Sequence, residues 1–158
     1  MAIVLSDVKK LSIVKIISKS DSALDLDRSD WEAYESDLIA NEHKLVFKTD
    51  QEPTVFVCKF DLSGKEAAIA KDAMIGGVDE DKQVKLSYGK WAYTVVRMVL
   101  KEIKNPAGVS DTIELKKDSK GYVDEYTMSL LEQAGVVSEI FNHYVSLTQT
   151  DVKGEAKN

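Results

Sequence analysis

Three aspartates lie close together near the start of the chain, at Asp25, Asp27 and Asp30. Carboxylates at alternating positions are typical ligands of calcium in helix–loop–helix sites. A calcium loop that began at Asp25 would need a glycine at position 30 and a glutamate at position 36, where the chain has Asp30 and Ser36. The spacing therefore predicts a solvated loop that leads into a helix, and it predicts no metal site.

The residue types that most often carry catalysis are few and separated. His43 and His143 lie far apart in the sequence, and Cys58 is the single cysteine, within an apolar run. A histidine metal site needs two or three converging ligands, and a general base needs a neighbour that orients it. We therefore predict a partly exposed helix position for His143 and a buried structural role for Cys58, with no disulfide.

A phosphate-binding loop is the next chemistry to test. Gly64-Lys65 supplies two letters of the motif, but Lys59 stands where the first glycine is needed and Glu66 where the hydroxyl is needed. No Gly-x-Ser-x-Gly nucleophile elbow occurs either. The sequence therefore predicts no catalytic residue and no cofactor.

Two aromatic residues beside the aspartates favour a different role. Trp31 and Tyr34 follow Asp30 at helical spacing, in an acidic setting. Aromatic side chains are enriched at protein interfaces. We therefore predict an interaction surface formed by Trp31, Tyr34, Asp25, Asp27 and Asp30.

The charge along the chain is uneven. The 158 residues carry a net charge of −6; residues 1–20 hold four lysines and one aspartate, and residues 21–42 hold eight acids and Arg28. The overall acidity argues against nucleic acid as a partner, because such binding needs a concentrated basic surface. The two segments could attract each other or neighbouring copies of the chain, and a solvated acidic face is the simpler alternative.

Membrane and export segments are not expected. No apolar run approaches the roughly 20 residues of a membrane-spanning helix. The apolar stretch Met1 to Ile17 is interrupted by Asp7 and by lysines, unlike the apolar core of a signal peptide. These features predict a cytosolic protein without a membrane partner.

Strand patterns occur in the N-terminal half. Residues 11–18 alternate like a strand rich in β-branched side chains, although a helix from Ser6 fits part of the same pattern. Residues 44–48 and 53–60 predict two strands of an antiparallel hairpin, with Phe56 and every second side chain after it facing the core.

Helix patterns occupy most of the remaining chain. Ser29 with Glu32, and Ser63 with Glu66, have the spacing of capping boxes, and Gly76-Gly77 is expected to end the second helix in a left-handed conformation. The predicted helices cover residues 30–40, 64–75, 86–104, 124–134 and 138–147.

Turn signals divide the last helices. A short strand at residues 112–116 is expected to pair with Tyr122-Val123 across a turn at residues 118–121, and Asp124 and Gly135 are expected to cap the next helix. Strands come first and helices later, which predicts an α+β fold with a small antiparallel sheet in the N-terminal half and a helical C-terminal half. We expect one domain over residues 1–150 and a flexible polar C-terminal tail over residues 151–158.

Three stretches together resemble a known family. They are the segment from Tyr34 to Glu52-Pro-Thr-Val-Phe56, the helix start Leu62-Ser-Gly-Lys-Glu66, and the pair of short helices at residues 128–133 and 137–147. In this order they resemble small tailed-phage proteins of the tail assembly chaperone type and related minor virion components. The resemblance covers most of residues 30–150, and it implies assembly through protein contacts with no catalytic residues.

The function expected from the resemblance is that of a bacteriophage virion or tail assembly protein. Its expected partners are other phage structural or assembly proteins and further copies of itself, in the host cytoplasm during assembly. Whether it stays in the mature virion is left open. The alternative is an intracellular acidic interaction module, such as a host-directed inhibitor or adaptor, whose acidic surface covers a basic partner.

Overall fold

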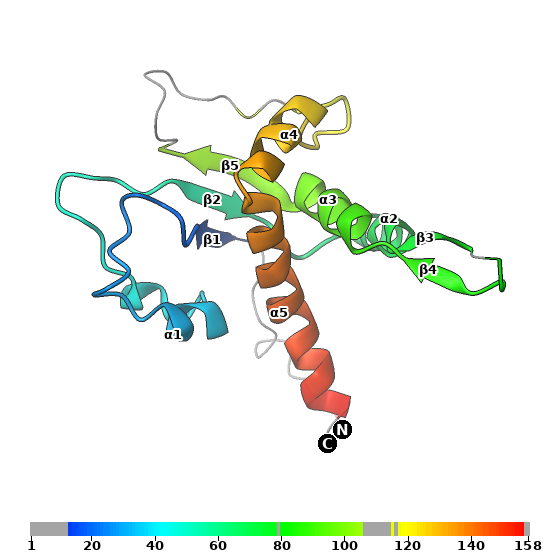
Figure 1. The fold of residues 1–158 in the computed structure, drawn as a ribbon, viewed down its shortest axis with the longest axis horizontal. Coiled ribbons are helices and arrows are strands. Elements are labelled where there is room, and N and C mark those ends of the chain that lie inside the picture. Colours follow the sequence, from blue (N-terminus) through cyan, green and yellow to red (C-terminus); the bar gives the residue numbers. More distant parts are fainter. Residues whose placement is uncertain (1–12, 79, 106–114, 116, 157–158) are drawn as a thin grey trace.

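A computed structural model describes residues 13–78, 80–105, 115 and 117–156 (Figure 1). The elements are, in chain order, β1 (Val14–Ile17), α1 (Trp31–Ser36), the 3-10 turn η2 (Glu42–Lys44), β2 (Val55–Cys58), α2 (Gly64–Ala73), β3 (Ile75–Val78), β4 (Val84–Leu86), α3 (Tyr88–Val99), β5 (Leu100–Lys104), α4 (Glu125–Gln133) and α5 (Val136–Ala156). The small antiparallel sheets and the helical C-terminal half confirm the predicted α+β class.

The central sheet has the strand order β1-β2-β5, and both pairings are antiparallel. Phe56 on β2 lies between Ile16 on β1 and Ile103 on β5. The side chains of Phe56 and Cys58 are buried, whereas Val57 between them is half-buried. This confirms the predicted alternation of β2 and the buried position of Cys58.

The predicted hairpin between residues 44–48 and 53–60 is wrong. The first of these segments begins in η2 and contains only an isolated bridge, at Phe47. The partners of β2 are β1 and β5, which lie far from it in the sequence. They bring the buried side chains of Ile16 and Leu100 opposite those of β2, and such cross-strand pairs stabilise a sheet.

The predicted helix over residues 86–104 is wrong at its C-terminal end. α3 ends one residue before Leu100, where β5 begins. Leu100 and Ile103 continue the helical spacing, but pairing with β2 fixes them in a strand. The ammonium group of Lys101 donates a hydrogen bond to the carbonyl of Met98 (2.7 Å), which satisfies one of the last carbonyls of the helix.

The glycines Gly76 and Gly77 do not cap α2 as predicted. They lie in β3, which pairs with β4 in a second, two-stranded sheet. A Cβ on Gly76 would lie 3.0 Å from the Cβ of Ser87, so glycine permits this close approach. Figure 1 shows the β3–β4 hairpin extending away from the rest of the molecule.

The helical half is built on local signals that the sequence contains. α3 packs against α2 and α5, and α4 packs against α5. The predicted capping box of Ser63 and Glu66 at α2 is present. Asp124 accepts a hydrogen bond from the amide of Thr127 (2.9 Å) at the start of α4, and Gly135 follows the helix with φ of 75°, as predicted.

The remaining predicted boundaries have mixed outcomes. Most of the predicted strand at residues 112–116 and the alternative helix from Ser6 lie outside the described residues, except that Lys117 forms an isolated bridge with Val123. α5 runs to Ala156, so helical backbone occupies positions where the sequence predicted a tail.

One carboxylate joins the two ends of the fold. Glu139 on α5 accepts hydrogen bonds from the hydroxyl of Ser18 (2.5 Å) and from the backbone amide of Lys19 (2.9 Å). The turn after β1 is thereby attached to the last helix. This contact holds α5 against the N-terminal half of the chain.

Candidate interaction surface

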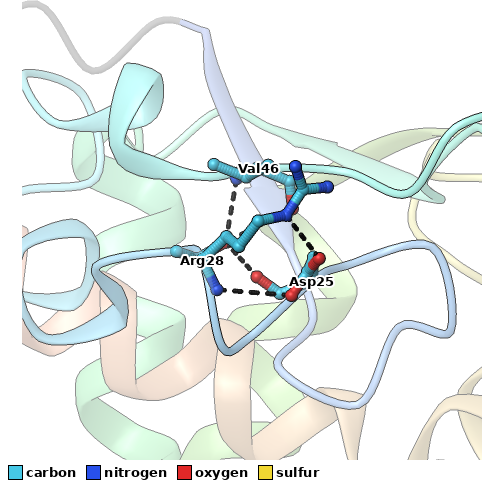
Figure 2. A network of polar contacts seen from close by, with 4 residues as sticks. Asp25, Arg28 and Val46 are labelled. Atoms are coloured by element: carbon cyan, nitrogen blue, oxygen red, sulfur yellow. Dashed lines mark hydrogen bonds and ion pairs between the residues drawn. The ribbon is translucent and has the colours of Figure 1, made fainter.

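The aspartates predicted to form an interaction surface lie in the segment between β1 and β2, around α1. We refer to residues 21–42 as the acidic lobe. The carboxylate of Asp25 accepts hydrogen bonds from Nε of Arg28 (2.7 Å) and from its backbone amide (3.3 Å). Figure 2 shows the guanidinium group of Arg28 folded over Asp25. The hydrogen bond from Arg28 lowers the pKa of Asp25, so this carboxylate is charged and engaged within the lobe.

The lobe is fixed to the segment that follows η2. The amide of Asp25 donates to the carbonyl of Val46 (2.9 Å), and the hydroxyl of Ser29 donates to the carbonyl of Asp25 (2.6 Å) and accepts from the amide of Val46 (2.8 Å). The predicted capping role of Ser29 is therefore wrong. Asp30 caps α1 instead, by accepting from the amide of Ala33 (3.2 Å).

Tyr34 belongs to the core, so the prediction that placed it on the surface is wrong. Its side chain is fully buried, and its hydroxyl accepts a hydrogen bond from the amide of Ile17 on β1 (3.1 Å). Its ring lies 5.1 Å from the ring of Trp31 and 6.1 Å from that of His143. Burial raises the pKa of Tyr34 to about 12. The residue therefore joins α1 to the sheet and to α5.

The outer face of the lobe retains part of the predicted surface. Asp27 and Asp30 are exposed, Trp31 is half-buried against Tyr34, and Leu26 beside Asp27 keeps 43% of its surface exposed. The lobe thus presents carboxylates with an aliphatic side chain among them. Such a surface is suited to a cationic protein partner.

The described residues contain no grouping suited to hold a metal. No three His, Cys, Asp or Glu side chains converge in the part of the chain that the structure describes. Burial raises the pKa of the Cys58 thiol, which keeps it protonated and unreactive. Among the described residues, none of the helices is both long and apolar enough to cross a bilayer.

His143 is buried, which differs from the predicted partly exposed position. Only 5% of its surface is accessible, and its ring lies edge-on to the ring of Tyr34 on α1, with centroids 6.1 Å apart. Burial lowers the pKa of His143, while the carboxylates of Glu139 and Glu35 act in the opposite direction. The neutral imidazole is therefore the form that the fold accommodates.

This burial predicts that the protein loses stability on mild acidification. In the unfolded chain a histidine titrates near pH 6.5, and in the folded protein the pKa of His143 is lower. At pH values between these two pKa values, the unfolded state binds more protons than the folded state. The contribution of His143 to the free energy of unfolding is therefore at its maximum above pH 6.5, and it is lost as the pH falls through the lowered pKa. Urea unfolding at pH values from 7.5 to 5.5 measures this slope.

The matched variants are His143→Gln and His43→Gln, because His43 is exposed. The first should flatten the pH dependence of the free energy of unfolding, and the second should leave it as in the wild type. An unchanged slope in His143→Gln would show that other groups cause the acid sensitivity.

One cavity lies between the turn after β1 and the junction of α4 and α5. It has a volume of about 390 Å³ and is lined by Ser18, Ser20, Asp21, Ser22, Thr54, Phe56, Ile103, Leu131, Ala134 and Val136. The carboxylate of Asp21 accepts from the amides of Ala23 and Thr54 (both 2.8 Å), and Ser18 binds Glu139. These polar groups shape the turn.

Another cavity combines cationic and aromatic side chains. It has a volume of about 360 Å³ and is lined by Ile69, Tyr93, Thr94, Arg97, Met98, Asp118, Ser119, Lys120 and Tyr122. We call it the basic cavity. The sequence did not predict it, because its lining comes from α2, α3 and the turn before α4. Lys120 in the predicted turn at residues 118–121 is the one local signal of its charge.

Exposed apolar side chains gather at the base of the β3–β4 hairpin. Ile75 and Leu86 are cross-strand partners whose exposed fractions are 47% and 74%. Tyr88, at the start of α3, is 54% exposed, and its hydroxyl hydrogen-bonds Asn142 on α5 (2.6 Å). Grouped exposed apolar side chains are typical of protein contact sites.

Comparisons with protein-family models, with curated proteins and with solved structures found no match to this chain. The three surfaces described above are therefore the basis for a functional hypothesis. They are the acidic lobe, the basic cavity and the apolar hairpin base.

Proposed function

We propose that this protein is a bacteriophage virion or tail assembly protein that acts through protein–protein contacts and without catalysis. The phage context is supported by the resemblance of residues 30–150 to tail assembly chaperones and minor virion components. In this proposal the protein works in the host cytoplasm during assembly, as an oligomer that binds other phage structural proteins.

The observation that carries the proposal is the hairpin β3–β4. It extends from the body of the molecule (Figure 1), and at its base it bears Ile75 and Leu86, whose side chains are largely exposed. Two-stranded hairpins are of marginal stability by themselves, and a partner that covers this one would stabilise it. Exposed aliphatic side chains grouped at the base of this hairpin are typical of protein contact sites.

The experiment is to replace these side chains without removing the hairpin. In Ile75→Thr/Leu86→Thr, threonine keeps the β-propensity and removes apolar surface. We expect capture of tail tube or tape-measure proteins from an infected-cell lysate to weaken by about tenfold or more, as is common for central interface residues. Mass spectrometry of the captured proteins provides the measurement.

The control is Tyr126→Gln/Leu130→Gln on α4, which removes exposed apolar side chains elsewhere on the surface. This variant should capture the same proteins as the wild type. If wild-type protein captures a single stoichiometric host protein and no phage structural protein, the alternative of a host-directed inhibitor or adaptor is supported and the assembly role is rejected.

A further inference from the structure

The basic cavity has a fixed cationic wall. The guanidinium group of Arg97 on α3 donates from Nε to the carbonyl of Val123 (2.7 Å) and from Nη2 to the carboxylate of Asp118 (2.7 Å). The same carboxylate accepts from the backbone amides of Lys120 (2.8 Å) and Tyr122 (3.0 Å). The charge of Asp118 is therefore used to build the turn and to hold Arg97 in place.

Further lysines surround this wall. The amide of Lys59 donates to the carbonyl of Val99 (2.8 Å), which places Lys59 beside the end of α3, and Lys117 is bridged to Val123. Burial lowers the pKa of Lys101, the charge of Glu66 raises it, and the charges of Lys117 and Lys59 lower it further. Of these cations, Arg97 and Lys120 line the cavity beside the carboxylate of Asp118, while Lys59 and Lys117 lie on neighbouring segments.

The uncharged lining of the cavity combines apolar and aromatic side chains with the hydroxyl residues Thr94 and Ser119. Tyr93 and Tyr122 line it together with Ile69 and Met98, and Ile69 keeps 40% of its surface exposed. A ligand that fits would carry negative charge at its edge and an apolar group for the interior. Tyrosine rings beside cationic side chains are common in interfaces with acidic protein segments.

We propose that the basic cavity receives the Leu26-Asp27 loop of the acidic lobe of a second copy of this chain. In this contact Leu26 enters between the tyrosines, while Asp27 and the other lobe carboxylates face Lys117 and Lys120. The inference rests on the proposed assembly function and names the surface through which copies join.

Charge complementarity selects this occupant. The acidic lobe carries eight acids and Arg28, and Arg28 is already engaged by Asp25. The lobe also offers Leu26 as an exposed apolar side chain next to Asp27. The chain therefore contains both surfaces of one contact, so two copies of the same chain can form it.

The two surfaces cannot meet within one molecule. Figure 1 shows α1 on one side of α5 and of the central sheet, and the segment leading into α4 on the other side. A contact between two different surfaces of identical chains is heterologous, and it propagates into a closed ring or an open filament. The geometry thus gives a chain of copies rather than a symmetric pair.

The test uses two charge-reversal variants of the full chain. The lobe variant is Asp27→Lys/Glu32→Lys/Glu35→Lys, and the cavity variant is Lys59→Glu/Lys117→Glu/Lys120→Glu. All six side chains are exposed. We expect each variant alone to self-associate at least about tenfold more weakly than the wild type, because like charges then face each other. Mass photometry and sedimentation velocity at 50 and 500 mM salt give the oligomer distribution.

Mixing the two variants provides the decisive measurement. The reversed lobe of one fits the reversed cavity of the other, and the two unchanged surfaces also fit each other. An equimolar mixture should therefore restore wild-type assemblies with alternating copies, and high salt should dissociate them. Because each variant serves as the folded partner of the other, restoration also shows that both have folded.

The controls reverse three charges each at other exposed positions, with Lys65→Glu/Lys71→Glu/Lys104→Glu and Glu52→Lys/Glu125→Lys/Glu132→Lys, and should assemble as the wild type does. Failure of the mixture to assemble, or a wild type that stays monomeric at all concentrations and salts, would overturn the inference. The inference would also be overturned if the cavity variant lost binding to a different acidic protein while its self-association stayed unchanged. If capture of tail proteins still depends on Ile75 and Leu86 in those cases, the assembly function stands without this contact.

Discussion

Replacing Phe141 by alanine is expected to lower the free energy of unfolding by about 3–5 kcal/mol, the usual cost of deleting a buried aromatic ring. Phe141 on α5 is fully buried. Its ring meets Tyr88 and Trp91 of α3 edge-on, with centroids 5.0 and 4.7 Å away, and it stacks on Tyr144 at 6.1 Å. The substitution would remove the side chain at the centre of the contact between α3 and α5.

Urea unfolding followed by tryptophan fluorescence measures this loss, because the Trp91 ring is in contact with Phe141. Domains have total stabilities of about 5–15 kcal/mol, so this substitution would remove a large part of the free energy of unfolding. Phe141→Leu should cost less because it fills part of the cavity. The control Tyr126→Ala removes an aromatic ring that is 68% exposed, and it should change the free energy of unfolding by about 0.5 kcal/mol or less. Equal effects of Phe141→Ala and Tyr126→Ala would contradict the packing seen here.

The second large effect is expected at Tyr34. Removing its hydroxyl in Tyr34→Phe leaves the buried amide of Ile17 without its acceptor, which should cost about 1–3 kcal/mol. Tyr34→Ala also removes the ring that packs against Trp31 and His143, and it should cost about 3–5 kcal/mol. Both losses follow from the position of Tyr34 inside the fold.

The same variants distinguish a core residue from an interface residue. If Tyr34 acted in the core alone, Tyr34→Phe would lower the midpoint of urea unfolding and leave self-association of the folded protein unchanged. The control Tyr126→Phe removes an exposed hydroxyl and should leave both measurements unchanged. If Tyr34→Phe kept wild-type stability but assembled more weakly, the result would show that Tyr34 takes part in the contact between molecules.

Several signals that act over a few residues predicted the structure well, although the capping box at Ser29 and the cap at Gly76-Gly77 failed. The capping box at Ser63, the cap at Asp124 and the left-handed Gly135 each depend on bonds that close within one helical turn. The alternation of β2 was also correct, since the burial of Phe56 follows from the pleat of a strand. Such features need no knowledge of the rest of the chain.

The features that failed depend on distant partners. Leu100 and Ile103 have helical spacing, but they form a strand because they pair with the edge of β2 that β1 leaves open. Tyr34 was predicted at the surface because its neighbours in the sequence are acidic, and it is buried by contacts with β1 and with His143 on α5. The basic cavity is assembled from three separated segments in the same way, so no single stretch of sequence predicts it.

The position of β2 between an earlier and a later strand affects how the chain folds as it leaves the ribosome. β2 can pair with β1 once residue 58 has emerged, but its other edge stays open until β5 arrives at residues 100–104. At a synthesis rate of about 10 residues per second, that interval is about 4 seconds. The attachment of Ser18 to Glu139 comes later still. The nascent chain therefore presents an unpaired edge of β2 during that interval, and such an edge can pair with a strand of a neighbouring chain.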